Sequence, residues 1–147
     1  MISGKTLQLS GAAASFAIAL VHVGIVIAGA PAYRYFGAAG LSYLALQGSP
    51  IPALETLLLA ALFAAFGLYA LSGAGAIRAL PLLRPGLFAI GGLYTLRGLI
   101  LILDIVRLFR GPIYPFRQTV FSAVALGIGI LYLAGALGSR RNEESIR

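Results

Sequence analysis

The chain has 147 residues, of which 60% are hydrophobic and only 10% are charged, whereas an average soluble domain carries ~25% charged residues. So short a soluble chain has too much surface to hide this apolar material, which argues against a soluble globular enzyme, a disordered chain and a nucleic-acid-binding domain. Eleven basic and four acidic residues give a net charge of +7. In a chain this apolar, the basic excess indicates membrane topology rather than a polyanionic partner.

Four stretches are apolar enough to cross a bilayer, since a spanning helix needs roughly 20 mostly apolar residues. They cover about 6–30, 51–71, 85–109 and 118–137. Because backbone polar groups must be satisfied internally in lipid, we predict an all-α membrane protein, a four-transmembrane-helix bundle. We expect one transmembrane domain over 1–147 with a polar tail at 139–147. The first stretch is longer than a signal-peptide core, and Pro31 would follow the cleavage point directly, so we interpret it as a retained helix.

The connection at 31–50 is as long as a helix but too polar to span. Its aromatic residues, among them Tyr33 and Tyr43, suit an interfacial segment that lies along the bilayer surface between the first and second helices. Gly37 and Gly40 are expected to bend it. The connection at 110–117 holds two prolines and is expected to form a short turn.

Four spans place both termini on one side of the membrane. Basic residues on the two sides then number six against four, which by the positive-inside rule weakly favours cytoplasmic termini. The terminal side holds Lys5, Arg78, Arg84, Arg140, Arg141 and Arg147, and the other side holds Arg34, Arg107, Arg110 and Arg117.

Small residues on the spanning stretches predict close contacts between helices, because small side chains let two backbones approach. On the third stretch they are Gly91, Gly92 and Gly98; on the fourth they include Gly127, Gly129 and Gly135.

Ionisable side chains within a spanning helix are costly, and four occur here. At 1.5 Å per residue, Glu55 lies about 6 Å, Asp104 about 8 Å, His22 about 12 Å and Arg97 about 18 Å below the face opposite the termini. All four are therefore biased toward the half of the bilayer under the 31–50 segment.

These residues predict a polar pocket in an otherwise apolar bundle. Tyr94, Arg97 and Asp104 share one face of the third helix. Arg97 and Asp104 are seven residues apart, too far to pair directly, and Glu55 is a plausible bridge, with His22 bonded to either acid. The pocket candidates are His22, Glu55, Tyr94, Arg97 and Asp104, and the candidates at its mouth are Tyr33, Arg34, Gln118 and Ser122.

Each candidate also has a purely structural interpretation. Glu55 would lie in the first turn of its helix, where the macrodipole favours an acid, and Glu55 or Asp104 could reach water at a helix end. Asp104 could also pair with Arg107, three residues further on. An isolated histidine such as His22 is more often a bonded interior group than a ligand. Arg97 is the strongest functional signal, because it is too deep to reach the interface easily.

Motifs for catalysis or cofactor binding are missing from the sequence. It holds no cysteine and one histidine, which excludes disulfides, thiolate chemistry and an HExxH zinc site. A metal site from His22, Glu55 and Asp104 is disfavoured by the neighbouring charge of Arg97. We therefore expect no metal, no cofactor and no nucleic-acid partner, and the sequence leaves open whether the chain is an enzyme.

Three segments carry a resemblance to known proteins. HVGIVIAGAPAYRYFGA, FGLYALSGAGAIRALPLLR and LYTLRGL resemble an uncharacterised group of small bacterial four-helix inner-membrane proteins. The layout is also similar to that of DoxX-like and EXPERA-like membrane proteins, the latter of which bind or isomerise sterol-type molecules. The resemblance implies a bacterial inner-membrane location and carries over no catalytic residue.

Three functions fit these observations. The first is an intramembrane site for a small lipophilic or amphipathic molecule, with Arg97 neutralising its polar group. The second is a structural or accessory membrane subunit whose polar groups lock the helices together. The third is transport of a proton or small solute, which would need a homo-oligomer because four short helices rarely enclose a pathway. Membrane lipids are expected partners in each case.

Overall fold

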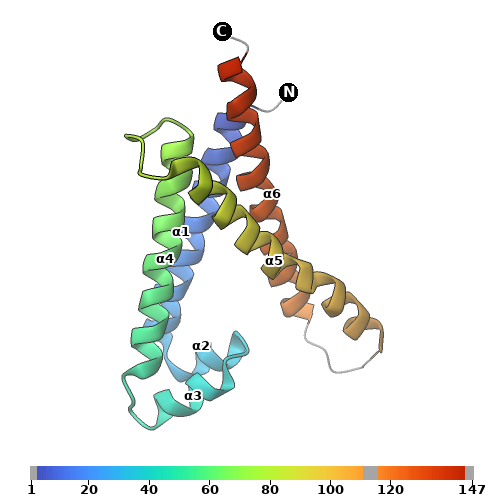
Figure 1. Ribbon diagram of the computed structural model, residues 1–147. Helices are drawn as coiled ribbons and strands as arrows, with labels where there is room; N and C mark the ends of the chain where they lie inside the picture. The colour runs from blue at the N-terminus through green and yellow to red at the C-terminus, as the bar shows by residue number, and fades with distance from the viewer. Residues whose placement is uncertain (1–2, 111–115, 145–147) are drawn as a thin grey trace. The chain divides into compact units, whose positions relative to one another are not determined.

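The computed structural model describes residues 3–110 and 116–144, and the regular structure in that part of the chain is entirely helical (Figure 1). Four of the helices, α1, α4, α5 and α6, are long and apolar enough to cross a membrane. The predicted all-α class and its four spans are therefore confirmed, and the chain is a multi-pass membrane protein. The helices are α1 (Gly4–Ala28), α2 (Ala30–Tyr35), α3 (Ala39–Leu46), α4 (Ile51–Gly73), α5 (Leu83–Arg110) and α6 (Phe116–Glu144).

The spanning helices begin and end close to the predicted positions. α5 starts two residues before Pro85, which falls in its first turn, where a missing N–H costs no helical hydrogen bond. α6 differs most, because it continues to Glu144 and so includes most of the stretch predicted as a polar tail. Residues 145–147 and the middle of the turn predicted at 110–117, residues 111–115, lie outside the described residues.

Contacts divide the chain into two compact units, Met1–Ala12 with Leu68–Arg147, and Ala13–Gly67. In the first unit, α5 and α6 pack against each other and cross (Figure 1). A Cβ at Gly98 would lie only 2.5 Å from the Leu126 Cα, so the two backbones meet where a side chain could not fit. Gly91, Gly129 and Gly135 are also closely packed, as predicted, whereas Gly92 and Gly127 face open space and make no such contact.

The start of α1 belongs to the same unit and contributes a buried amide. Gln8 is 0% exposed, and its Nε2 donates a hydrogen bond to the Tyr132 carbonyl of α6 at 3.2 Å. A Cβ at Gly135 would lie 2.7 Å from this nitrogen, so the absence of a side chain at Gly135 makes room for the amide. The Tyr132 ring packs against that of Tyr94 on α5, with centroids 5.7 Å apart.

The second unit holds the rest of α1, the short helices α2 and α3, and α4 as far as Gly67. Here α1 and α4 pack closely, since a Cβ at Gly67 would lie 2.8 Å from the Phe16 ring. α2 and α3 form a helical hairpin (Figure 1), which turns at Gly37 with φ +89°. The Ser42 hydroxyl donates to the Ala30 carbonyl at 2.8 Å and ties the two helices together.

The predicted bends of the 31–50 segment are half right. Gly37 has the left-handed backbone that only glycine adopts without strain. Gly40, by contrast, lies inside α3, where helical hydrogen bonding leaves no bend. The interfacial location of this hairpin remains a prediction.

Candidate functional site

A chain of two hydrogen bonds links α5 to α6 through three polar side chains. The Arg97 Nη1 donates to the Ser122 hydroxyl at 2.9 Å, and this hydroxyl donates to the Asp104 Oδ2 at 2.5 Å. Ser122 is 0% exposed and Asp104 is 2% exposed. We call Arg97, Ser122 and Asp104 the polar relay. It brings together three of the residues that the sequence singled out.

The backbone geometry explains why these residues meet. Arg97 and Asp104 are two turns apart and share a face of α5. Gly98, next to Arg97, allows the close approach to Leu126, and Ser122 is one turn before Leu126 on α6. Ser122 thus occupies the bridging role for which the sequence offered Glu55.

The relay engages only part of the hydrogen-bonding capacity of Arg97. A guanidinium carries five N–H donors, and the one hydrogen bond of Arg97 to another described residue is that to Ser122. The side chain is exposed, although it lies near the middle of α5. An arginine at that depth costs about 2.5–3.5 kcal/mol on insertion scales unless its donors find partners. The relay therefore holds a cation in place while leaving most of its donors available.

The surroundings of the relay combine a buried hydroxyl with aromatic packing. Thr119 lies one turn before Ser122, and its buried Oγ1 has no hydrogen-bond partner among the described residues. Gln118, predicted at the pocket mouth, is half-buried in the first turn of α6. Tyr94, one turn before Arg97, is buried.

His22 belongs to the second unit and has a defined hydrogen bond. Its Nδ1 lies 2.8 Å from the Ile18 carbonyl, and its ring lies 4.9 Å from that of Phe63. Because a carbonyl only accepts, Nδ1 carries the proton, and in the neutral ring Nε2 is an acceptor. This bond to its own helix matches the structural interpretation of the residue, and it leaves one nitrogen for another group.

The other candidates in the second unit are dispersed. Glu55 is exposed on α4 and lies beyond the first turn, which holds no acidic residue, so the helix-dipole interpretation is wrong. Arg34 is exposed on α2, whereas Tyr33 is buried and its hydroxyl has no partner among the described residues. In the first unit, burial of Asp104 rules out the idea that its carboxylate reaches water directly.

Gln8 is a buried polar residue that the sequence analysis did not single out. Its Oε1 is buried and has no hydrogen-bond partner among the described residues. The sequence does show an amide in the first apolar stretch. It lies near the helix end, however, where a polar side chain can reach the membrane surface, so its burial is not predicted. Burial of this residue follows from packing against α6, which the sequence does not reveal.

Comparison of the chain with protein-family models, with curated proteins and with solved structures finds no match. Among the described residues, no group of three or more His, Cys, Asp or Glu side chains could hold a metal ion.

Proposed function

We propose that this multi-pass membrane protein binds a small amphipathic molecule whose anionic group is held by Arg97. The observation that carries the proposal is an exposed arginine near the middle of a spanning helix that gives one of its five donors to the protein. A guanidinium matches the planar geometry of a carboxylate or phosphate, which it can engage with two parallel hydrogen bonds. The expected ligand therefore has an anionic head and a lipophilic body.

The other relay residues affect how strongly Arg97 binds an anion. Asp104 compensates the charge of Arg97 through one intervening hydroxyl, so a bound anion shares the cation with an internal carboxylate. This arrangement favours reversible binding, because the guanidinium stays compensated when the ligand leaves. The buried hydroxyl of Thr119, one turn before Ser122 on α6, offers one further hydrogen bond.

Several finer features belong to the same proposal. We place the protein in a bacterial inner membrane because of the resemblance given above, and we place both termini in the cytoplasm because of the basic residues counted there. The likeness to DoxX-like and EXPERA-like proteins agrees with a lipophilic ligand. His22, Glu55, Tyr33 and Arg34 lie in the second unit, so their roles stay predictions from the sequence and the site proposed at Arg97 does not include them.

The test compares Arg97→Gln with Arg107→Gln, which removes an exposed arginine ten residues further along the same helix. The full chain is reconstituted in lipid nanodiscs and titrated with oleate and with lysophosphatidate as carboxylate and phosphate probes. We expect Arg97→Gln to weaken binding of at least one probe about tenfold or more, the value of a charge-assisted hydrogen bond. Arg107→Gln should leave both affinities unchanged. Equal affinities in the two variants would contradict the proposal.

A second candidate is the structural or accessory role, which the relay also supports because it ties α5 to α6. The two functions differ in what Arg97→Gln removes. A structural relay predicts a lower unfolding midpoint with unchanged probe binding, whereas a ligand site predicts lost binding in a protein that still folds. Thermal unfolding of the same nanodisc samples therefore separates the two.

A further inference from the structure

The loop between α4 and α5, residues 74–82, is held in a defined shape by two side chains of α4. The Ser72 hydroxyl donates to the Arg78 carbonyl at 3.2 Å and accepts from the Leu80 N–H at 3.0 Å. The Tyr69 hydroxyl donates to the Pro81 carbonyl at 3.1 Å. Three of the loop's backbone polar groups are thus hydrogen-bonded to side chains of α4. These bonds fix the backbone of the loop and so the direction of its side chains.

Two apolar side chains of this loop are exposed, and one of them has a strained backbone. Leu82 is 78% exposed and has φ +53°, a left-handed backbone that a bulky residue rarely adopts. Ile77 is also exposed. A strained leucine that contacts so little of its own chain points to a contact outside it.

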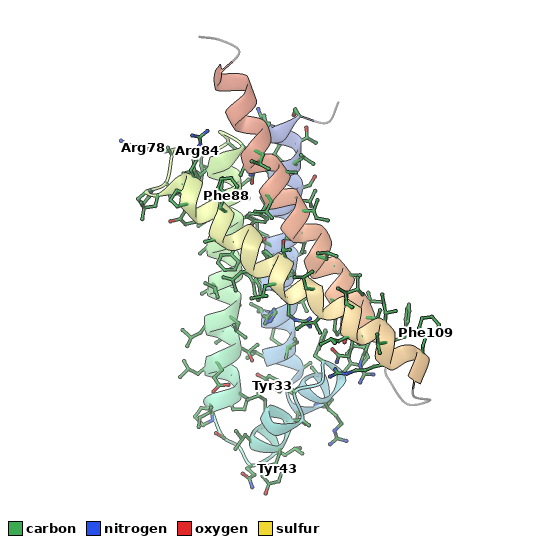
Figure 2. All side chains as sticks on the ribbon, turned by 45° about the vertical axis from the view of Figure 1, so that its right-hand side comes forward. Tyr33, Tyr43, Arg78, Arg84, Phe88 and Phe109 are labelled. Carbon is green, nitrogen blue, oxygen red and sulfur yellow. The ribbon has the colours of Figure 1, made fainter. Side chains whose placement is uncertain are left out.

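Two arginines lie beside these apolar residues. Arg78 is exposed within the loop, and Arg84 is exposed just after it. Figure 2 shows both at the end of the helices where α4 gives way to α5, with Phe88 one turn further along α5. Arg84 falls in the first turn of α5, where the helix dipole disfavours a cation, so the dipole does not account for the charge at this position.

The position of the loop identifies its surroundings. α4 and α5 are each long and apolar enough to span the bilayer, so the loop that joins them lies at the membrane surface. We propose that this loop binds the headgroup of an anionic phospholipid, with Arg78 and Arg84 on its phosphate and with Leu82 and Ile77 at the acyl boundary. The arginines supply charge complementarity, and the outward leucine supplies apolar contact at the same depth. This site is separate from the relay and does not depend on the ligand proposed for Arg97.

The experiment measures lipid retention by the full chain with native mass spectrometry, using protein equilibrated in equal amounts of phosphatidylglycerol and phosphatidylcholine. We expect the double variant R78Q/R84Q to retain phosphatidylglycerol about thirtyfold less well, because each basic residue near an anionic surface contributes about fivefold. The matched control R34Q/R107Q removes the same charge from two other exposed arginines and should change retention far less.

Two further measurements separate lipid binding from misfolding of the loop and from binding of free phosphate. The variant R78K/R84K retains the charge and should keep most of the phosphatidylglycerol, which also shows that the loop tolerates substitution. Inorganic phosphate at the concentration of the lipid should fail to displace it, because phosphate has no acyl chains to contact Leu82. Equal losses in R78Q/R84Q and R34Q/R107Q, loss in R78K/R84K, or displacement by phosphate would each overturn the proposal.

Discussion

The Ser122 hydroxyl of α6 donates a hydrogen bond to the Asp104 carboxylate of α5 across 2.5 Å, and both residues are buried. The same hydroxyl accepts from Arg97, so one serine joins a cation and an anion that their own helix keeps two turns apart. A hydroxyl is the smallest group that can accept from one partner and donate to the other. The hydrogen bonds of Asp104 and of Arg97 to α6 therefore both involve the same oxygen atom.

Replacement of Ser122 by alanine should destabilise the protein by about 1.5–3 kcal/mol, the range for a hydrogen bond to a charged group. The buried Asp104 carboxylate loses this donor, and Arg97 loses its acceptor. Chemical denaturation in mixed micelles measures the change in the free energy of unfolding. Ser10→Ala, at an exposed position on α1, is the control and should stay within about 0.5 kcal/mol of the parent. A similar small change in Ser122→Ala would show that the relay contributes nothing to stability.

Gly98→Ala should force α5 and α6 apart. The new Cβ would lie 2.5 Å from the Leu126 Cα, a backbone atom that cannot move without the helix. We expect overpacking to lower the free energy of unfolding by about 1–3 kcal/mol. Binding of the oleate or lysophosphatidate probe should also weaken, because Arg97 directly precedes Gly98.

Gly92→Ala is the matched control for this substitution, since its Cβ would meet nothing within 4 Å. It should stabilise the helix by up to about 1 kcal/mol through helix propensity. Thermal unfolding and probe titration of the two variants in parallel check both effects. Equal stability of the two variants would mean that the close approach of α5 and α6 does not occur.

Gln8→Met should leave the protein as stable as the parent, or more stable by about 1–2 kcal/mol. The substitution removes an Oε1 that is buried without a partner among the described residues, and methionine keeps the volume. Gln8→Ala loses the same amide but also opens a cavity, so it should be destabilised by about 2 kcal/mol or more. Unfolding midpoints of the two variants distinguish the effects. Equal destabilisation by methionine and alanine would show that the amide itself is required.

Leu82→Gly should raise stability by about 1 kcal/mol, because glycine adopts φ +53° without steric cost. Ile77→Gly is the control: it removes another exposed apolar side chain from the same loop, at a residue without a positive φ. That variant should be slightly less stable than the parent, since glycine gains backbone freedom on unfolding. Thermal unfolding in nanodiscs free of anionic lipid measures the difference without the lipid contact. A lower midpoint for Leu82→Gly would mean that the leucine side chain is held by the protein itself.

Local patterns were sufficient to predict much of the fold. The four spans follow from the length of apolar runs, because a helix is the structure that satisfies its own backbone in lipid. The turn at Gly37 follows from glycine's backbone freedom, although Gly40 shows that a glycine alone does not specify a bend. The small-residue pattern was right at Gly98 and wrong at Gly92, because spacing identifies a face of a helix but not the neighbour against which it packs.

The candidate site, like the fold, was predicted only in part from the sequence. The sequence by itself determined that Arg97 and Asp104 share one helix face and that both are costly in a membrane, because these properties depend on helical periodicity and on side-chain chemistry. Only the tertiary structure decided that Ser122 joins them and that Gln8 is buried against Tyr132. Those contacts join residues from different helices. Which residues meet depends on how closely the helix backbones approach, and a local sequence pattern does not specify that distance.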